Sequence, residues 1–214
     1  MKIEEPDISG SYTYADYMTW SWTEMRELIR GKIYNMSPAP RTVHQKVVGK
    51  LFLKIGNFLE GKKCQAFVAS FDVRLPLSPK KKEDRDITTV VQPDVCVVCD
   101  PAKIDERGCI GAPDLMIEVL SPHTSSKDLR EKFDVYEESG VREYWVVHPQ
   151  EQTVLVYMLN EKGKYEGVLT PYVRTDRISP ITLPGLSINL VEIFPEEIWW
   201  LVILHSLAQF FKSW

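Results

Sequence analysis

The chain has 214 residues, a formal net charge of −4 at pH 7 and a sequence pI near 5.7. Its composition, with 44% hydrophobic and 26% charged residues, is ordinary for a globular protein, and its length suits one sizeable domain with an appendage. The acidic balance excludes a global electrostatic footprint for nucleic acid, so any such binding must use local patches.

The N-terminal region divides into an arm and the start of a domain that we expect to span residues 21–195. Residues 1–20 show little periodicity, which predicts an irregular arm. Residues 21–24 read as a capping box, which predicts a short helix ending at Gly31, with a short strand at 33–36. Apolar residues then recur at helical spacing and predict a long helix over 42–60.

The centre of the chain alternates predicted strands and helices. We expect a strand over 64–77 that bends at Pro76, and a solvated loop over 78–86. Further strands are predicted at 95–99, 115–120, 143–147 and 153–159, with short strands continuing to about 194. A turn-rich connection is expected over 105–111 and a helix over 125–139. This order indicates an α/β or α+β fold, a mixed β-sheet flanked by helices, in which the helix at 125–139 can join two parallel strands.

The C-terminal residues 196–214 are very apolar and include Trp199, Trp200 and Trp214. The segment is too short for an ordinary transmembrane helix, so we expect no integral membrane span. We predict a helix packed on the domain or on a second copy of the chain, which would make a homodimer. Attachment to a membrane surface is the alternative.

The four cysteines, Cys64, Cys96, Cys99 and Cys109, are few and irregularly spaced. With no signal peptide recognisable, we expect reduced thiols and a cytoplasmic protein. Cys96 and Cys99 form a C-x-x-C, but residues i and i+3 of a strand point to opposite faces. We therefore expect buried core cysteines instead of a zinc site.

Two Pro-Asp pairs, at 93–94 and 113–114, each open an apolar run, and the second run contains Glu118. A charge inside such a run is costly to bury unless it is paired or coordinates a metal. Asp94 can lie beside Glu118, because neighbouring strands are about 4.8 Å apart. Asp114 is roughly 13 Å from Glu118 along an extended strand, which favours a structural role unless the strand bulges. Asp72 is a further acid that a neighbouring strand could bring close, or that could pair with Arg74.

Two carboxylates from adjacent strands suit Mg²⁺, with Mn²⁺ as an alternative, because magnesium is usually held by one or two carboxylates and several waters. Such an ion lowers the pKa of its bound water and stabilises charge on a transferring phosphoryl group.

The motif Pro93-Asp94 followed by Glu118 resembles the PD-(D/E)xK nuclease signature. A longer ordered set resembles the Uma-two family of endonucleases over roughly residues 20–195. The matching pieces are Gly31, Met36–Pro40, His44, Gln92–Val95, Ala112–Pro122, Asp128, Lys132, Tyr136, Gly140-Val141 and Glu143–Val147. The resemblance implies a restriction-endonuclease-like fold and a Mg²⁺-dependent DNA endonuclease that hydrolyses phosphodiester bonds, with Asp94, Glu118 and the Val119 carbonyl as metal ligands.

The sequence departs from the general signature at Leu120, where a lysine is usual. The resemblance implies that this lysine is replaced by Lys132 on the following helix, which a long side chain permits. A solvent-exposed Asp128–Lys132 pair is the alternative. The matched position of His44 implies contact with phosphate or proton transfer, whereas a helix-start histidine alone suits capping.

The missing lysine and the acidic pI leave a second function open: a catalytically inactive module that keeps the nuclease fold and binds nucleic acid or protein. Candidate contacts to a DNA backbone are basic residues on the long helix and in the following loop: Lys46, Lys50, Lys54, Lys80, Lys81 and Lys82. Each run alternatively forms a solvated face. No pattern specifies a base sequence, which requires side chains at base edges.

Overall fold

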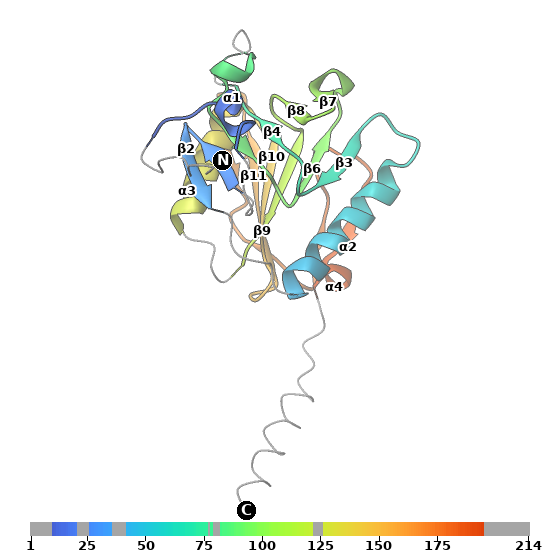
Figure 1. The fold of residues 1–214 in the computed structure, drawn as a ribbon. Helices are drawn as coiled ribbons and strands as arrows, with labels where there is room; N and C mark the ends of the chain where they lie inside the picture. Colours follow the sequence, from blue (N-terminus) through green and yellow to red (C-terminus); the bar gives the residue numbers. More distant parts are fainter. Residues whose placement is uncertain are drawn as a thin grey trace, which may run out of the picture.

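The computed structural model describes residues 10–20, 26–35, 42–76, 78, 82–121 and 126–194 (Figure 1). The predicted capping box at 21–24, Lys80, Lys81 and the apolar segment 196–214 lie outside the described residues.

The larger sheet carries the two Pro-Asp strands at its centre. Its strands follow the order β12-β11-β10-β9-β6-β3, and β13 pairs with β11. Their bounds are β3 Gln65–Val68, β6 Val95–Val98, β9 Leu115–Val119, β10 Glu143–His148, β11 Thr153–Leu159, β12 Tyr165–Gly167 and β13 Tyr172–Val173. β9 is antiparallel to β6 and parallel to β10, so the sheet is mixed, as predicted.

A second sheet has the order β2-β1-β5-β4-β8-β7. Its strands are β1 Arg26–Ile29, β2 Lys32–Asn35, β4 Val73–Arg74, β5 Val90–Val91, β7 Ile104–Asp105 and β8 Gly108–Ile110. A small pair, β14 Arg177–Ile178 and β15 Ile188–Asn189, completes the described strands. β1 and β2 form a hairpin whose turn residues, Arg30 and Gly31, both have positive φ, the geometry of a tight two-residue turn.

The helices are α1 Tyr14–Tyr17, α2 Thr42–Leu59, α3 Ser126–Ser139 and α4 Leu190–Ile193, with 3₁₀ turns η1 Asp84–Asp86 and η2 Pro101–Lys103. α2 buries a stripe of residues spaced by four: Val47, Leu51, Ile55 and Leu59. α3 joins the parallel strands β9 and β10 and ends before Gly140, which has φ 83°.

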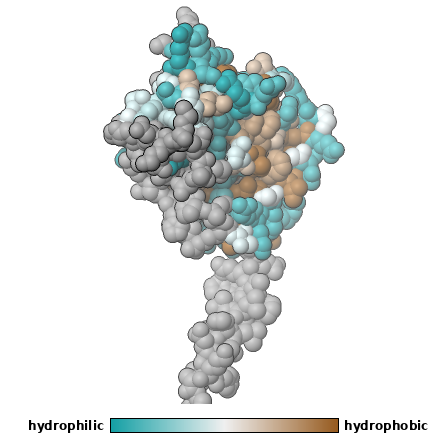
Figure 2. Space-filling view, in the orientation of Figure 1, coloured by the Kyte–Doolittle hydropathy of each residue, from teal (hydrophilic) through white to brown (hydrophobic). Residues whose placement is uncertain are grey.

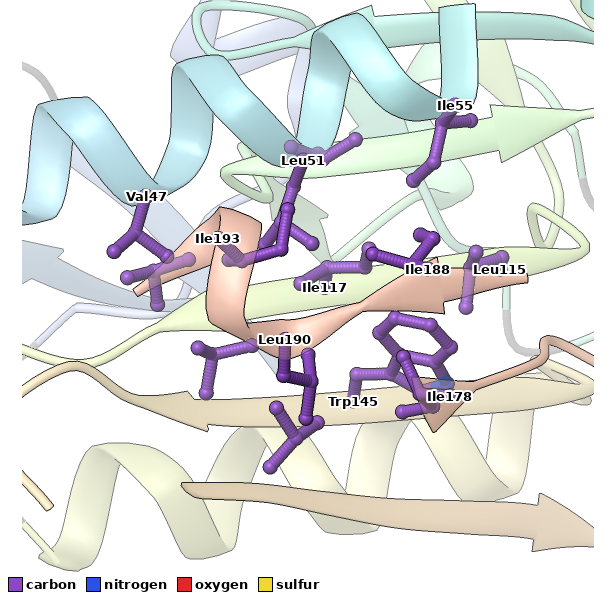
Figure 3. Packing of buried hydrophobic residues seen from close by; sticks show 14 of the residues in the cluster. Val47, Leu51, Ile55, Leu115, Ile117, Trp145, Ile178, Ile188, Leu190 and Ile193 are labelled. Atoms are coloured by element: carbon purple, nitrogen blue, oxygen red, sulfur yellow. The ribbon is translucent and has the colours of Figure 1, made fainter. Parts of the chain in front are cut away.

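The larger sheet is covered on both faces, so β9 is buried along its whole length. On one face, alternate residues such as Leu115, Ile117 and Trp145 share one core cluster with α2 and with β14, β15 and α4, and Ile178 of β14 lies beside Trp145 (Figure 3). On the other face, residues such as Met116 and Cys96 pack with α3 and with the smaller sheet. The resulting α+β sandwich confirms the predicted fold class.

Three predictions in the N-terminal half are wrong. The helix predicted to end at Gly31 is replaced, over 26–35, by the β1–β2 hairpin. The arm is not irregular throughout, because α1 begins with a capping box between Thr13 and Asp16, and Tyr14 is fully buried. The single strand predicted over 64–77 is two strands, β3 and β4, which belong to different sheets.

The cysteine prediction is wrong for two of the four residues. Cys64 and Cys99 form a disulfide across 35 residues of sequence, while Cys96 and Cys109 are free and buried. The expected opposite orientation of Cys96 and Cys99 is confirmed: Cys96 belongs to the core cluster on the α3 face, and Cys99 packs against the cluster beneath α2.

Figure 2 shows apolar side chains gathered over the part of the surface where β3, β6 and α2 lie in Figure 1, with hydrophilic residues around them. Leu53 on α2 and Val68 on β3 are among the exposed large hydrophobic residues, at 60% and 36% exposure. Within the described part of the chain, no helix has both the length and the apolar character needed to cross a bilayer.

Candidate active site

The two acids singled out in the sequence lie directly across from each other. β6 and β9 pair with Val95 opposite Ile117, so the register places Asp94 opposite Glu118. Asp94 Oδ2 accepts a hydrogen bond of 2.7 Å from the Val119 backbone N–H, which ties the start of β6 to the end of β9. The two carboxylate side chains are 18% and 9% exposed. The predicted lateral pairing is therefore present.

Lys132 comes from α3 and reaches the same pair. Its Nζ lies 3.0 Å from Glu118 Oε1, and the Tyr136 hydroxyl donates a hydrogen bond of 2.7 Å to that oxygen. Lys132 and Tyr136 are four residues apart, so they share one face of α3. The Lys132 side chain is only 12% exposed, which rules out the solvent-exposed alternative.

A third carboxylate, which sequence reasoning missed, also binds Lys132. Glu27 on β1 is 5% exposed, and its Oε1 lies 3.0 Å from Lys132 Nζ. The same oxygen accepts a hydrogen bond of 2.8 Å from the Gln92 backbone N–H. Residues 26–29 read Arg-Glu-Leu-Ile, so Glu27 does not stand inside an apolar run as Glu118 does, and the sequence carries no comparable signal for it.

His44, in the first turn of α2, approaches the pair from the other helix. Its Nε2 lies 3.3 Å from Asp94 Oδ1, and it also hydrogen-bonds the backbone of Val119. Burial lowers the pKa of His44, but the hydrogen bond and charge of Asp94 outweigh that effect and raise the pKa above its ordinary value.

The other two candidate acids lie elsewhere. Asp114 Oδ2 accepts a hydrogen bond of 2.8 Å from the Cys99 N–H at the far end of β9, which is the structural role expected for it. Asp72 accepts hydrogen bonds from the Tyr14 hydroxyl at 3.3 Å and from Gln92 Nε2 at 2.8 Å. Asp72 therefore supports the site through Gln92 and does not join the carboxylate pair.

The site holds more negatively charged side chains than positively charged ones. Burial raises the pKa of Glu118 to about 7, the Lys132 charge opposes this, and the charges of Asp94 and Glu27 add to it. Burial also lowers the pKa of Lys132, but Glu118 and Glu27 more than reverse that effect and keep the ammonium protonated. The Lys132 ammonium contacts two carboxylates, and Asp94 adds a third negative charge beside Glu118, so a further cation would relieve the repulsion.

The site offers carboxylate oxygens in the number that magnesium uses. No group of three or more His, Cys, Asp or Glu side chains among the described residues has the arrangement of a metal site. Magnesium needs only one or two carboxylates, because it keeps several of its waters. The paired Asp94 and Glu118, with the raised pKa of Glu118, therefore fit such an ion.

Comparisons with known proteins identify the family and the fold. A curated protein of Synechocystis sp. (strain PCC 6803), named "Uncharacterized protein slr1290", is 26% identical over 175 residues, which cover 80% of this chain and 85% of that protein. A crystal structure from Anabaena variabilis, titled as "a putative nuclease belonging to DUF820", shares the fold with a TM-score of 0.65 at 22% identity, over 86% of this chain and 97% of that one. The Uma2 family model, described as "Putative restriction endonuclease", matches residues 15–191. The chain therefore belongs to the Uma2 family.

Proposed function

We propose that this protein is a nuclease that hydrolyses phosphodiester bonds in DNA with the help of Mg²⁺ or Mn²⁺. The observation that carries the proposal is the cluster of Asp94, Glu118 and Lys132. The register of β6 and β9 sets Asp94 opposite Glu118, and α3 brings Lys132 Nζ to 3.0 Å from Glu118 Oε1. Membership of a family described as a restriction endonuclease supports the reaction class.

Asp94 and Glu118 are the residues that would hold the ion, with the Val119 carbonyl as a further ligand. A bound divalent cation lowers the pKa of water and stabilises negative charge on a phosphoryl oxygen. Glu118 binds a cation best when it has lost its proton, so the proposed affinity rises as the pH passes about 7.

Lys132 acts in this proposal as a charged group and not as a base. Its two carboxylate partners raise its pKa, so the ammonium keeps its proton at neutral pH. A fixed ammonium in a site shielded from water stabilises the negative charge that develops on the phosphate during hydrolysis. His44 lies on the opposite side of Asp94 and is the proposed contact or proton carrier on that side.

The DNA backbone is expected to lie over α2. This helix carries Lys46, Lys50 and Lys54 and contains no acidic residue. Lys54 pairs with Glu192 on α4, whereas neither Lys46 nor Lys50 forms a salt bridge with a described residue. At about 100° per residue, Lys46 and Lys50 lie on a face of α2 turned away from His44. They can therefore contact only the flanking part of a DNA backbone whose reacting phosphate reaches the carboxylate pair.

The test is nicking of supercoiled plasmid by the full-length protein with Mg²⁺, with Mn²⁺ or with EDTA. Asp94→Asn and Glu118→Gln keep side-chain size and are expected to abolish nicking. Asp114→Asn, in the other Pro-Asp pair, is the matched control and should keep wild-type activity. Absence of metal-dependent nicking by the wild type, or nicking that persists in both site variants, contradicts the proposal.

The second candidate function is a nuclease-fold module that binds DNA without cleaving it. Leu120 favours it, because the usual lysine position cannot contribute a charge. DNA binding that depends on Lys46 and Lys50, combined with the absence of nicking under every metal condition, would support this candidate.

A further inference from the structure

Glu27 is the buried charge for which the proposed reaction gives no role. It comes from β1 in the smaller sheet. Asp94 directly precedes β6 and Glu118 lies within β9, both strands of the larger sheet, and Lys132 lies on α3. Burying a carboxylate is costly unless it is well paired, and Glu118 alone would suffice to neutralise Lys132. The second carboxylate on the same ammonium therefore requires its own explanation.

The Glu27 carboxylate is fixed from two directions. Its backbone lies in the β1–β2 hairpin, with Glu27 opposite Tyr34. Its Oε1 accepts the Gln92 backbone N–H at 2.8 Å, and the Gln92 side chain is held in turn by Asp72. Gln92 stands two residues before Asp94, so one short segment sets the positions of both Glu27 and Asp94.

The Lys132 side chain is long and flexible, so a second carboxylate contact is needed to fix the position of its ammonium. A lysine is a point charge on a flexible stem of four carbons, and one contact leaves its ammonium free to swing. Glu118 and Glu27 each lie 3.0 Å from Nζ and use two of its three N–H donors. Among the described residues these two carboxylates are the acceptors that Lys132 contacts, and they leave its third N–H donor without a described partner.

We infer that Glu27 is a positioning residue, which holds the Lys132 ammonium beside Glu118 with its remaining N–H donor available to the reacting phosphate. The expected effect of Glu27 on turnover rests on the proposed nuclease function. Its structural content, that Glu27 immobilises Lys132, is independent of that function.

The kinetic test compares Glu27→Gln and Glu27→Leu with the wild-type full-length protein. The amide oxygen of the introduced glutamine still accepts both hydrogen bonds, whereas leucine accepts neither, so the glutamine variant should retain more activity. We expect kcat to fall about tenfold for Glu27→Gln and about a hundredfold for Glu27→Leu, with KM for DNA unchanged. Equal loss in both variants, or a change confined to KM, overturns the inference.

Glu143 provides the matched control for stability. It is also a buried glutamate, 1% exposed, and accepts hydrogen bonds from Trp145 Nε1 at 2.8 Å and from the Thr182 hydroxyl at 2.9 Å, away from the site. Glu143→Gln should lower the melting temperature without lowering kcat per folded molecule. If the kcat loss in the Glu27 variants merely follows their folded fraction, as measured by circular dichroism at the assay temperature, Glu27 has a structural role only.

A second readout does not depend on activity. Acetylation of Lys132 by an N-hydroxysuccinimide ester, which attacks the neutral amine, is followed by mass spectrometry. It should be at least about tenfold faster in Glu27→Leu than in Glu27→Gln, because both variants lose the Glu27 charge but only the leucine variant frees the Lys132 side chain. The exposed Lys62 should react equally in both variants. Equal rates at Lys132 in the two variants overturn the inference, even if the protein cleaves DNA. A faster rate in Glu27→Leu upholds it, even if the wild type proves inactive.

Discussion

The two helices that reach the carboxylate pair differ in how they use their charges. α2 carries three lysines and no acid, while α3 contains five acidic and three basic residues. The described acids of α3 largely anchor it: Glu131 and Glu138 bind Arg30 in the β1–β2 turn, and Glu137 binds Lys164. The comparison indicates that α3 is fixed to the body of the protein to position Lys132, and that α2 presents positive charge outward.

The largest expected effect comes from removing the Lys132 ion pairs between α3 and the two buried glutamates. Lys132→Met should lower the free energy of unfolding by about 3–5 kcal/mol at pH 8, because it leaves Glu118 and Glu27 buried without their cation. Urea denaturation followed by tryptophan fluorescence measures this change. A loss below about 1 kcal/mol, within the range of exposed ion pairs, would show that water reaches the cluster.

The next effect is the pH dependence that Glu118 imposes. Its pKa is raised from 4.5 to about 7 in the folded protein, so the folded state binds more protons than the unfolded state between these values. The resulting stability is complete below about pH 4.5 and is lost as the pH rises through about 7, by roughly 3 kcal/mol. Urea denaturation in EDTA across this range measures the decline, and Glu118→Gln should remove it. A wild-type curve parallel to that of the variant would contradict the raised pKa.

A smaller effect is expected on DNA affinity when lysines of α2 are replaced. In a protein inactivated by Asp94→Asn, Lys46→Glu and Lys50→Glu should each weaken DNA binding roughly three- to tenfold and reduce the salt slope by about 0.9. Arg130→Glu is the matched charge reversal on α3 and should have little effect, because Arg130 lies among acidic residues. Fluorescence anisotropy of a labelled duplex measures all three. An equal loss in Arg130→Glu would mean that DNA does not distinguish the two helices.

The smallest effect concerns the anchor of α3. Arg30→Gln removes the ion pairs with Glu131 and Glu138, whose atoms lie at 3.5 and 2.6 Å. Because the Arg30 side chain is 40% exposed, solvent screening limits the loss to about 0.5–1 kcal/mol in thermal unfolding. Turnover should remain near the wild-type value. A large fall in kcat would place the anchor, and not only Lys132, in control of the site.

The long regular elements and the paired acids could be predicted from the sequence. α2 and α3 follow from apolar spacing, and the Asp94–Glu118 pair follows from a charge within a buried strand and the spacing between strands. Lys132 did not follow from spacing alone, because position 120, where the signature places lysine, is occupied by leucine. Its assignment needed the family resemblance, and the structure then placed Lys132 against Glu118.

The rest depended on contacts between residues distant in the sequence. The sequence pattern predicts a helix where the structure has the β1–β2 hairpin, because strands of only four residues each show too little alternation to outweigh a capping signal. That error hid Glu27, whose partners lie 65 and 105 residues away in the chain, at Gln92 and Lys132. The Cys64–Cys99 disulfide was hidden for the same reason, since spacing does not reveal which cysteines meet.

The link between β5 and β6 has a mechanical consequence. Only Gln92, Pro93 and Asp94 separate the two strands, which belong to different sheets, and the proline restricts the backbone of this link. A rocking motion of one sheet against the other would separate the two carboxylates that hold Lys132, because Glu27 belongs to the smaller sheet and Glu118 to the larger one. Insertion of a single residue into this link would therefore disable the site by displacing Asp94 from Glu27 and Lys132, although no residue of the site is replaced.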